Sequence, residues 1–172
     1  MSHQILRTAA SVVAVAVLLF SSAPGAAQQP SSDATRQIRE AQTMIRAEFR
    51  QFLLKEMKLS KEEEQAFWPL YERYSAEMRV ITDRYFIVVA EYVDRYSRGE
   101  IDDAAANKLI DSYFNARLEI LQFRQSYVSK FREVMSGVSV ARFYQLENKV
   151  QAEVDAALAV GIPLAGSRQD RT

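Results

Sequence analysis

The sequence predicts an all-α protein, built on a long antiparallel helical hairpin with flanking N- and C-terminal helices and expected to dimerise. Apolar residues recur at helical spacing over most of the chain, and no segment alternates polar and apolar residues as a strand does. The chain contains only five glycines, and Gly99, Gly137 and Gly161 fall where the helical periodicity stops. We therefore expect long helices separated by short connections.

Residues 1–27 have the features of a cleaved secretory signal. They combine a basic start, an apolar run from Val12 to Phe20 and a small-residue exit at Gly25-Ala26-Ala27. The apolar run is about nine residues long, well short of the ~20 needed to span a bilayer. Residues 28–32 are predicted to be a linker, residues 33–164 an all-helical domain and residues 165–172 a disordered tail. We expect a soluble exported protein, located in the periplasm.

The helical domain is predicted to begin with a helix from Asp33 to Lys58. A second helix starts after Ser60, whose hydroxyl is suited to cap it, and Glu63 completes a capping box. This helix extends to Tyr96, and Gly99 is the expected C-cap.

The second helix carries a heptad seam, because apolar and aromatic residues recur every seven positions in two offset series. The two series are Phe67, Tyr74, Ile81 and Val88, and Tyr71, Met78, Tyr85 and Tyr92. Pro69 interrupts the first turns and must either kink the helix or restart it.

Asp102 is predicted to start a third helix, which ends at Gly137, and Ser139 is predicted to cap a fourth from Val140 to Val160. One heptad row of the third helix comprises Ala106, Tyr113, Ile120, Tyr127 and Val134. Two long helices joined by a few residues fold back on one another as an antiparallel hairpin. Such a thin assembly leaves an aromatic face half covered. A homodimer could cover that face, or it could stay open for partners, and the two alternatives are compatible.

The composition argues against an enzyme. The only histidine is His3, within the predicted signal, and there is no cysteine. These residue types supply most metal ligands, nucleophiles and acid–base groups. No phosphate-binding loop or nucleophile elbow is present either. We expect no catalytic activity, no metal and no cofactor. Lys plus Arg and Asp plus Glu number 22 each, which argues against nucleic-acid binding.

Three arginines stand out because no acid lies four residues away from them: Arg84, Arg117 and Arg124. With Tyr85 and Tyr92 they are the candidate residues for binding a flexible client protein. The competing interpretation makes the tyrosines seam residues and the arginines part of a solvated face.

Other charges on the second helix are explained by pairing along the helix. Arg79–Asp83 and Glu91–Arg95 are spaced as i,i+4 pairs. Each such pair contributes only about 0.3–0.5 kcal/mol to stability.

Two segments, Leu59-Ser60-Lys61-Glu62-Glu63 and Val138-Ser139-Val140-Ala141-Arg142, are similar to a repeated helix-start motif. They resemble the twice-occurring Leu-Thr-x-x-Gln of the Spy/CpxP-type superfamily of periplasmic helical proteins. Serine replaces threonine in both segments and keeps the capping chemistry, whereas Glu63 and Arg142 replace the glutamine. The motif residues are Leu59, Ser60, Glu63, Val138, Ser139 and Arg142. Two further segments, Phe67-Trp68-Pro69-Leu70-Tyr71 and residues 141–149, are similar to an uncharacterised branch of exported helical proteins near this superfamily.

The resemblance implies a function. Spy-like members are ATP-independent chaperones, antiparallel dimers whose concave, basic and partly apolar face holds unfolded clients. CpxP-like members also restrain a membrane sensor kinase. The leading hypothesis is therefore an ATP-independent periplasmic chaperone or stress-response binding protein. The alternatives are a regulatory partner of an envelope sensor kinase or anti-sigma system, and a structural coiled-coil adaptor.

Overall fold

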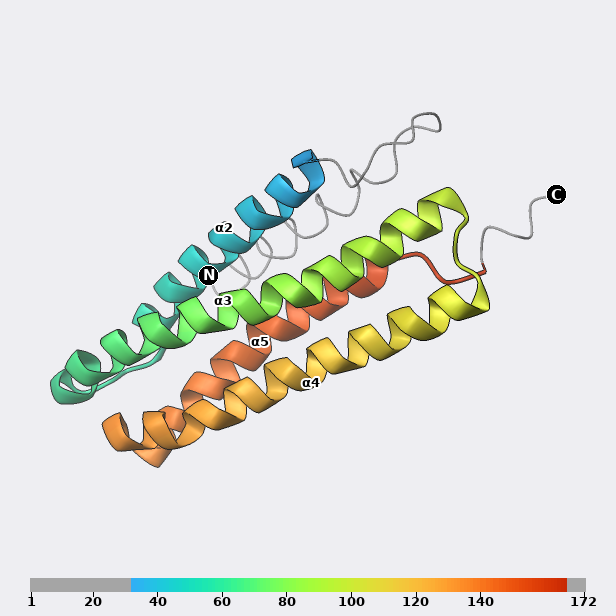
Figure 1. The fold of residues 1–172 in the computed structure, drawn as a ribbon. Coiled ribbons are helices and arrows are strands. Elements are labelled where there is room, and N and C mark those ends of the chain that lie inside the picture. The colour runs from blue at the N-terminus through green and yellow to red at the C-terminus, as the bar shows by residue number, and fades with distance from the viewer. Residues whose placement is uncertain (1–31, 167–172) are drawn as a thin grey trace.

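A computed structural model describes residues 32–166, and over that range the chain is all-helical, with no strand. The helices are α2 (Ser32–Glu56), α3 (Lys61–Arg98), α4 (Asp103–Val134) and α5 (Gly137–Gly161) (Figure 1). The predicted signal, the linker up to residue 31 and the tail from residue 167 lie outside the described residues. Among the helices described, none is both long enough and apolar enough to cross a membrane.

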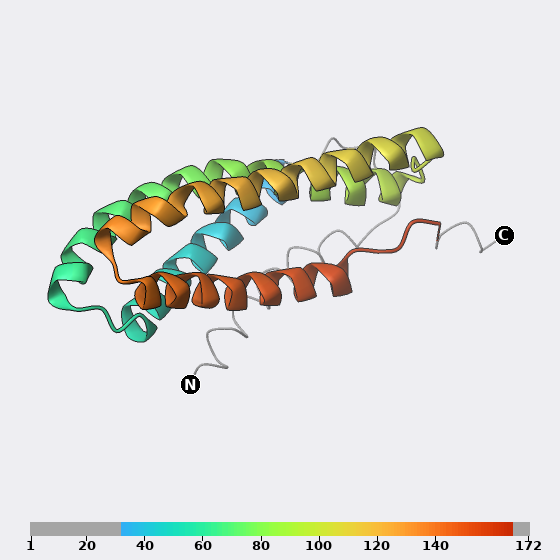
Figure 2. The ribbon, with the colours of Figure 1, turned by 90° about the horizontal axis from the view of Figure 1, so that it is seen from below.

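The two longest helices, α3 and α4, lie side by side and run in opposite directions (Figures 1 and 2). Their connection follows local rules. Gly99 adopts the left-handed conformation (φ 70°) that ends α3, and its N–H donates to the Tyr96 carbonyl at 3.1 Å. The Asp102 carboxylate then accepts from the Ala105 N–H at 2.7 Å and starts α4. Both predicted caps are confirmed.

The two shorter helices, α2 and α5, lie on one side of the α3–α4 pair (Figure 2). They contact each other where α2 ends and α5 begins, and they diverge from that point (Figures 1 and 2).

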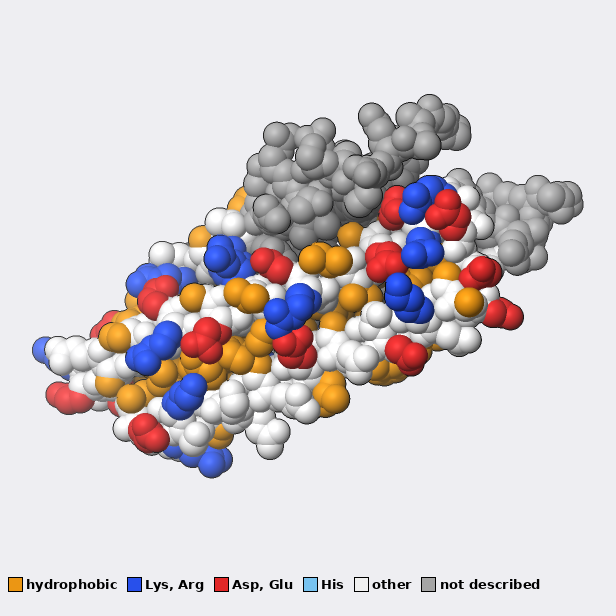
Figure 3. Space-filling view, in the orientation of Figure 1, with side chains coloured by type: hydrophobic (Ala, Val, Ile, Leu, Met, Phe, Trp, Pro, Cys, Tyr) orange, Lys and Arg blue, Asp and Glu red, His pale blue; other side chains and the backbone are white. Residues whose placement is uncertain are grey.

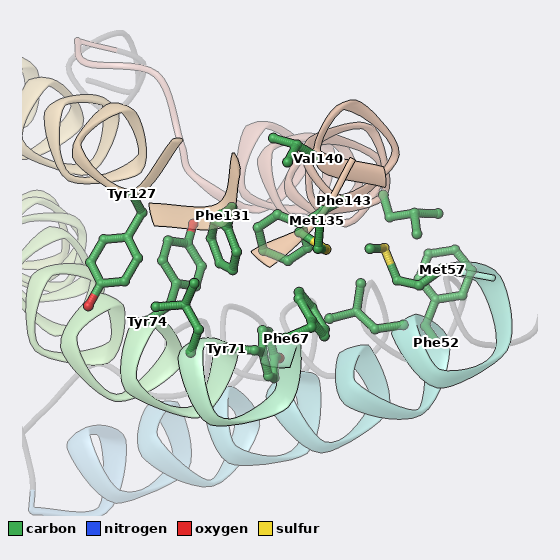
Figure 4. Packing of buried hydrophobic residues seen from close by; sticks show 13 residues of the cluster. Phe52, Met57, Phe67, Tyr71, Tyr74, Tyr127, Phe131, Met135, Val140 and Phe143 are labelled. Atoms are coloured by element: carbon green, nitrogen blue, oxygen red, sulfur yellow. The ribbon is translucent and has the colours of Figure 1, made fainter. Parts of the chain in front are cut away.

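Most of the core lies at the end where α2 leads into α3 and α4 leads into α5. Its 13 buried residues include Phe67, Phe131 and Phe143, each 0% exposed, whose rings lie against one another with Tyr74 (Figure 4). The Phe131 and Phe143 centroids are 4.7 Å apart. A smaller cluster lies farther along the helices and comprises Tyr85, Ala116, Val154 and Leu158.

The heptad seam of α3 is confirmed, because all eight of its residues are buried or half-buried. On α4 the row is interrupted at Tyr113, which is 38% exposed. Its ring lies at the edge of a cavity beside Tyr85, at a centroid distance of 6.0 Å, so α3 does not cover it.

Two expectations about helix limits are wrong. Gly137 does not end a helix, because α4 stops at Val134 and Gly137 is the first residue of α5. The cap of α5 is Ser136, whose Oγ accepts from the Ser139 N–H at 3.2 Å, while Ser139 itself is turned inward and buried.

Pro69 lies inside α3, which rules out one of the two alternatives, that the helix restarts there. Proline leaves the carbonyl four residues earlier without its helical partner. That residue, Gln65, is exposed to solvent, as is Pro69 itself. The capping box at Ser60 has already started the helix two turns earlier, so α3 continues through the proline.

Candidate functional site

A cavity of about 150 Å³ is lined by residues of α2, α3 and α5 and by Ile120 of α4, and we refer to it as the central cavity. Its wall is mostly apolar and aromatic. The residues that give it this character include Phe49 of α2, Tyr71, Met78 and Phe86 of α3, and Val150 and Val154 of α5. The cavity is not fully enclosed, and α2 and α5 diverge from each other beyond their contact (Figure 2).

Two arginines, Arg46 of α2 and Arg79 of α3, also line the central cavity. Within residues 43–166, no carboxylate oxygen lies within 4.0 Å of either guanidinium group. Among the described residues, Arg46 donates only to the Thr43 hydroxyl, at 3.1 Å. Burial, and then the positive charge of Arg79, lower the pKa of Arg46, while Asp83 acts in the opposite direction. The pair is therefore a concentration of positive charge that no carboxylate among the described side chains neutralises by an ion pair.

A carboxylate on the cavity wall, Glu147 of α5, has both of its oxygens engaged. Tyr74 Oη donates to Oε1, and Arg124 Nε donates to Oε2 at 2.9 Å. The side chain is only 15% exposed, and this burial raises the pKa of Glu147, whereas Arg124 opposes the rise. The network ties α3, α4 and α5 together, and Arg124 balances the charge of Glu147.

The three arginines predicted to bind clients all form ion pairs between helices. Arg84 of α3 donates through Nε and Nη2 to both oxygens of Glu119 on α4. Arg117 of α4 donates to both oxygens of Asp155 on α5, at 2.9 and 3.1 Å. Their acidic partners lie on neighbouring helices rather than four residues away. A client carboxylate would have to compete with these partners.

Tyr85, Tyr92 and Arg117 are brought together at a second cavity of about 550 Å³, between α3, α4, α5 and residues 162–165. Tyr85 is 5% exposed, and the Arg117 guanidinium lies 5.6 Å from its ring centroid. Tyr92 donates its hydroxyl to the Pro163 carbonyl at 2.7 Å. Arg84 and Arg124 do not line this cavity. The role of these five residues in client binding stays a prediction.

Four of the motif residues converge at one corner of the bundle. Glu63 Oε2 accepts from the Ser60 N–H at 3.1 Å, and Oε1 accepts from the Ser136 N–H at 2.8 Å and from Ser139 Oγ at 3.1 Å. These hydrogen bonds, led by that from Ser136, lower the pKa of Glu63. One carboxylate thus serves the N-termini of both α3 and α5. Arg142 Nη1 donates to the carbonyl of Glu56, the last residue of α2, at 3.0 Å.

The remaining two motif residues differ in how far their side chains are buried. Leu59 is half-buried and packs against the main core, whereas Val138 is 77% exposed. The geometry of Ser60, Glu63, Ser139 and Arg142 is that of helix capping. A carboxylate has enough acceptor sites for two helix N-termini, and a guanidinium donates to a helix C-terminus.

The sequence does not single out the arginines of the central cavity. Helical spacing predicts an i,i+4 pair of Arg79 with Asp83, but their charged groups are farther apart than 4.0 Å. The pair Glu91–Arg95 does form, at 3.0 Å. In a helix the acid-first order is the more favourable one. That order is present in Glu91–Arg95 and reversed in Arg79–Asp83, and it is the signal that could have distinguished them.

Within the described part of the chain, no group of three or more His, Cys, Asp or Glu side chains is placed to hold a metal ion. No protein-family model matches the chain, and neither a curated protein nor a solved structure matches it significantly. The geometry of the central cavity therefore carries the functional argument.

Proposed function

We propose that this chain is an ATP-independent periplasmic chaperone or stress-response binding protein of the Spy/CpxP type, exported by a cleaved signal and without catalytic activity. The observation that carries the proposal is the central cavity, an apolar wall with two arginines that have no ion-pair partner within residues 43–166. Unfolded proteins expose apolar side chains, which can contact the apolar wall, and carboxylates, which the two arginines attract.

The central cavity is large enough for one side chain of a client at a time. A volume of about 150 Å³ accommodates a benzene-sized group. Burying one large apolar side chain contributes roughly 1.5–3 kcal/mol. Such a contact is weak enough to break without ATP. Met78 on the wall adds adaptability, because methionine fills irregular gaps and suits promiscuous surfaces.

We further propose that the α3–α4 pair acts as the antiparallel hairpin of a homodimer. Along α4 a row of exposed apolar side chains recurs at helical spacing and lies apart from the central cavity: Ile110, Phe114, Leu118 and Leu121. They are between 50% and 65% exposed. Figure 3 shows apolar side chains interspersed with charged ones over the face formed by α3 and α4. Such a row is suited to cover its counterpart on a second copy.

The test is suppression of aggregation by the chain from Gln28 to Thr172 without ATP, followed by light scattering of two unrelated aggregating proteins. Thr82→Phe places a ring in the central cavity, and the Thr82 hydroxyl bonds only to carbonyls of its own helix. Val80→Phe adds the same ring at a site on α3 that is 51% exposed and does not line the cavity, so it is the matched control.

We expect the unmodified chain and Val80→Phe to suppress both aggregations, and Thr82→Phe to suppress them several-fold less. Suppression of neither protein would remove the chaperone proposal and favour a regulatory partner of an envelope sensor kinase or anti-sigma system, to be sought by crosslinking. Full activity of Thr82→Phe would show that clients are held elsewhere on the molecule.

A further inference from the structure

The central cavity combines a small apolar volume with two cationic groups, and this combination restricts what can bind there. Arg46 is half-buried and Arg79 is exposed, so a bound molecule can reach both guanidinium groups. They come from different helices, α2 and α3, and line the same cavity. A guanidinium group forms paired hydrogen bonds with a carboxylate more readily than with an uncharged acceptor.

The other charges at the central cavity do not cancel these two. Glu147 is the carboxylate on its wall, and Arg124 and Tyr74 occupy its oxygens. Asp83 acts on Arg46 from more than 4.0 Å away and forms no ion pair with it. The central cavity therefore keeps an excess of positive charge beside an apolar wall.

The second cavity provides an internal comparison. It also contains tyrosines and an arginine, but Arg117 there is held by both oxygens of Asp155. An incoming carboxylate would have to displace Asp155, and the tyrosine Tyr92 is already bonded to Pro163. Free positive charge beside an apolar wall distinguishes the central cavity from this one.

We propose that the central cavity selects client segments in which an aromatic residue is flanked by carboxylates. The ring enters the apolar volume between Phe49, Met78 and Val150, and an adjacent Asp or Glu pairs with Arg46 or Arg79. This inference rests on the proposed chaperone function and narrows the clients it prefers. A basic segment is disfavoured, because its cations would lie beside the two arginines.

The experiment measures binding of three fluorescently labelled peptides of equal length by anisotropy, with the chain from Gln28 to Thr172. One peptide has phenylalanine flanked by glutamates, the second has phenylalanine flanked by lysines, and the third has alanine flanked by glutamates. We expect the first to bind at least about tenfold more tightly than either of the others. Added salt should reduce that difference, because the arginines are accessible to solvent.

The double variant Arg46→Gln, Arg79→Gln should bind the two phenylalanine peptides equally. The control is Arg73→Gln, which removes an exposed arginine of α3 that does not line the central cavity. This control should keep the full preference. Circular dichroism would show whether all variants remain helical.

Equal binding of the acidic and basic phenylalanine peptides by the unmodified chain would overturn this inference and leave the chaperone proposal standing. A preference that survives in the double variant would overturn it as well. Tighter binding of octanoate than of the acidic peptide would assign the cavity to a free carboxylic acid instead. Absence of binding to every peptide, together with no suppression of aggregation, would remove the chaperone proposal itself.

Discussion

The two ends of the α3–α4 pair differ in how they are held together. At the closed end, where α2 leads into α3 and α4 into α5, 13 buried residues form one cluster. Side chains from other helices also satisfy helix termini there. Toward the distal half, from Tyr85 to the Gly99 connection, the cluster has four buried residues. Ile87 and Phe114 are 64% and 65% exposed. Buried side chains are concentrated at the closed end, and the central cavity extends from there, at Tyr71 and Tyr74, toward Tyr85 and Phe86.

The largest effect is expected from Phe143→Ala at the closed end. Phe143 is fully buried, and its ring packs against Phe67, Phe131 and Tyr74 at centroid distances of 4.7 to 5.7 Å. Removing it should lower the free energy of unfolding by about 3–5 kcal/mol, because the cavity left behind cannot collapse. Urea unfolding followed by circular dichroism measures this loss. A loss below about 1 kcal/mol would mean that the closed end does not hold the fold.

Two leucines of α5, one in each region, allow a direct comparison of how much each region contributes to stability. Leu146 belongs to the closed-end cluster and Leu158 to the distal cluster, and they are 7% and 5% exposed. We expect Leu146→Ala to cost about 3–4 kcal/mol and Leu158→Ala about 2 kcal/mol, because sparse surroundings relax more easily. Urea unfolding of both variants tests the difference. Equal losses, or a larger loss at Leu158, would contradict the comparison.

A substitution of Glu63 should destabilise the closed end without changing its apolar core. Glu63→Ala removes the acceptor shared by the N-termini of α3 and α5 and should cost about 1–2 kcal/mol. Glu63→Gln keeps one acceptor oxygen and should cost less. A loss for Glu63→Gln equal to that for Glu63→Ala would argue against the two-helix role of the carboxylate.

The lowered pKa of Glu63 also predicts that the stability of the fold depends on pH. Folding lowers the pKa of Glu63, so the ionised form is favoured in the folded state. Its stabilising effect is complete above the ordinary glutamate pKa of about 4.3, and it is lost as the pH falls through the lowered value. Urea midpoints of the unmodified chain and of Glu63→Gln should therefore converge toward pH 3. A constant difference between them from pH 7 to pH 3 would contradict this assignment.

The smallest effect is expected from Arg84→Gln. Arg84 pairs with Glu119, but the two side chains are 50% and 43% exposed, and exposed ion pairs contribute little. The urea midpoint should stay within experimental error of the unmodified chain. A clear loss of stability would show that the α3–α4 pair depends on this contact more than its exposure indicates.

Helix type and most helix starts could be predicted because capping is local in sequence. Ser60 with Glu63, Gly99 and Asp102 act as their spacing predicts. The start of α5 could not be predicted in the same way, since Ser136 and Ser139 are three residues apart and each can cap a helix. The choice depends on Glu63, 76 residues before Ser139, which bonds to Ser139 only after the chain has folded.

The ion pairing of the candidate site residues was harder to predict than the helix starts, because it depends on contacts between segments that are far apart in the sequence. Arg84 and Arg117 look unpaired in the sequence because their acids lie 35 and 38 residues away. Arg79 looks paired in the sequence but has no ion-pair partner among the described residues. Helical spacing shows which residues share a face of one helix, whereas ion pairing is decided by the register between helices.

The central claim is that clients bind at the central cavity while the closed end holds the fold. Hydrogen exchange followed by mass spectrometry, with the chain from Gln28 to Thr172 alone and with an excess of unfolded client, tests both parts. We predict slow exchange around Phe67–Tyr74 and Phe131–Leu146 in either state, although Tyr71 and Tyr74 also line the cavity. Client-dependent protection should be limited to the lining segments outside that slowly exchanging core, residues 46–49, 75–86 and 150–154. Client-dependent protection confined to the outer face of α4, or slow exchange in the distal half and fast exchange at the closed end, would contradict the account.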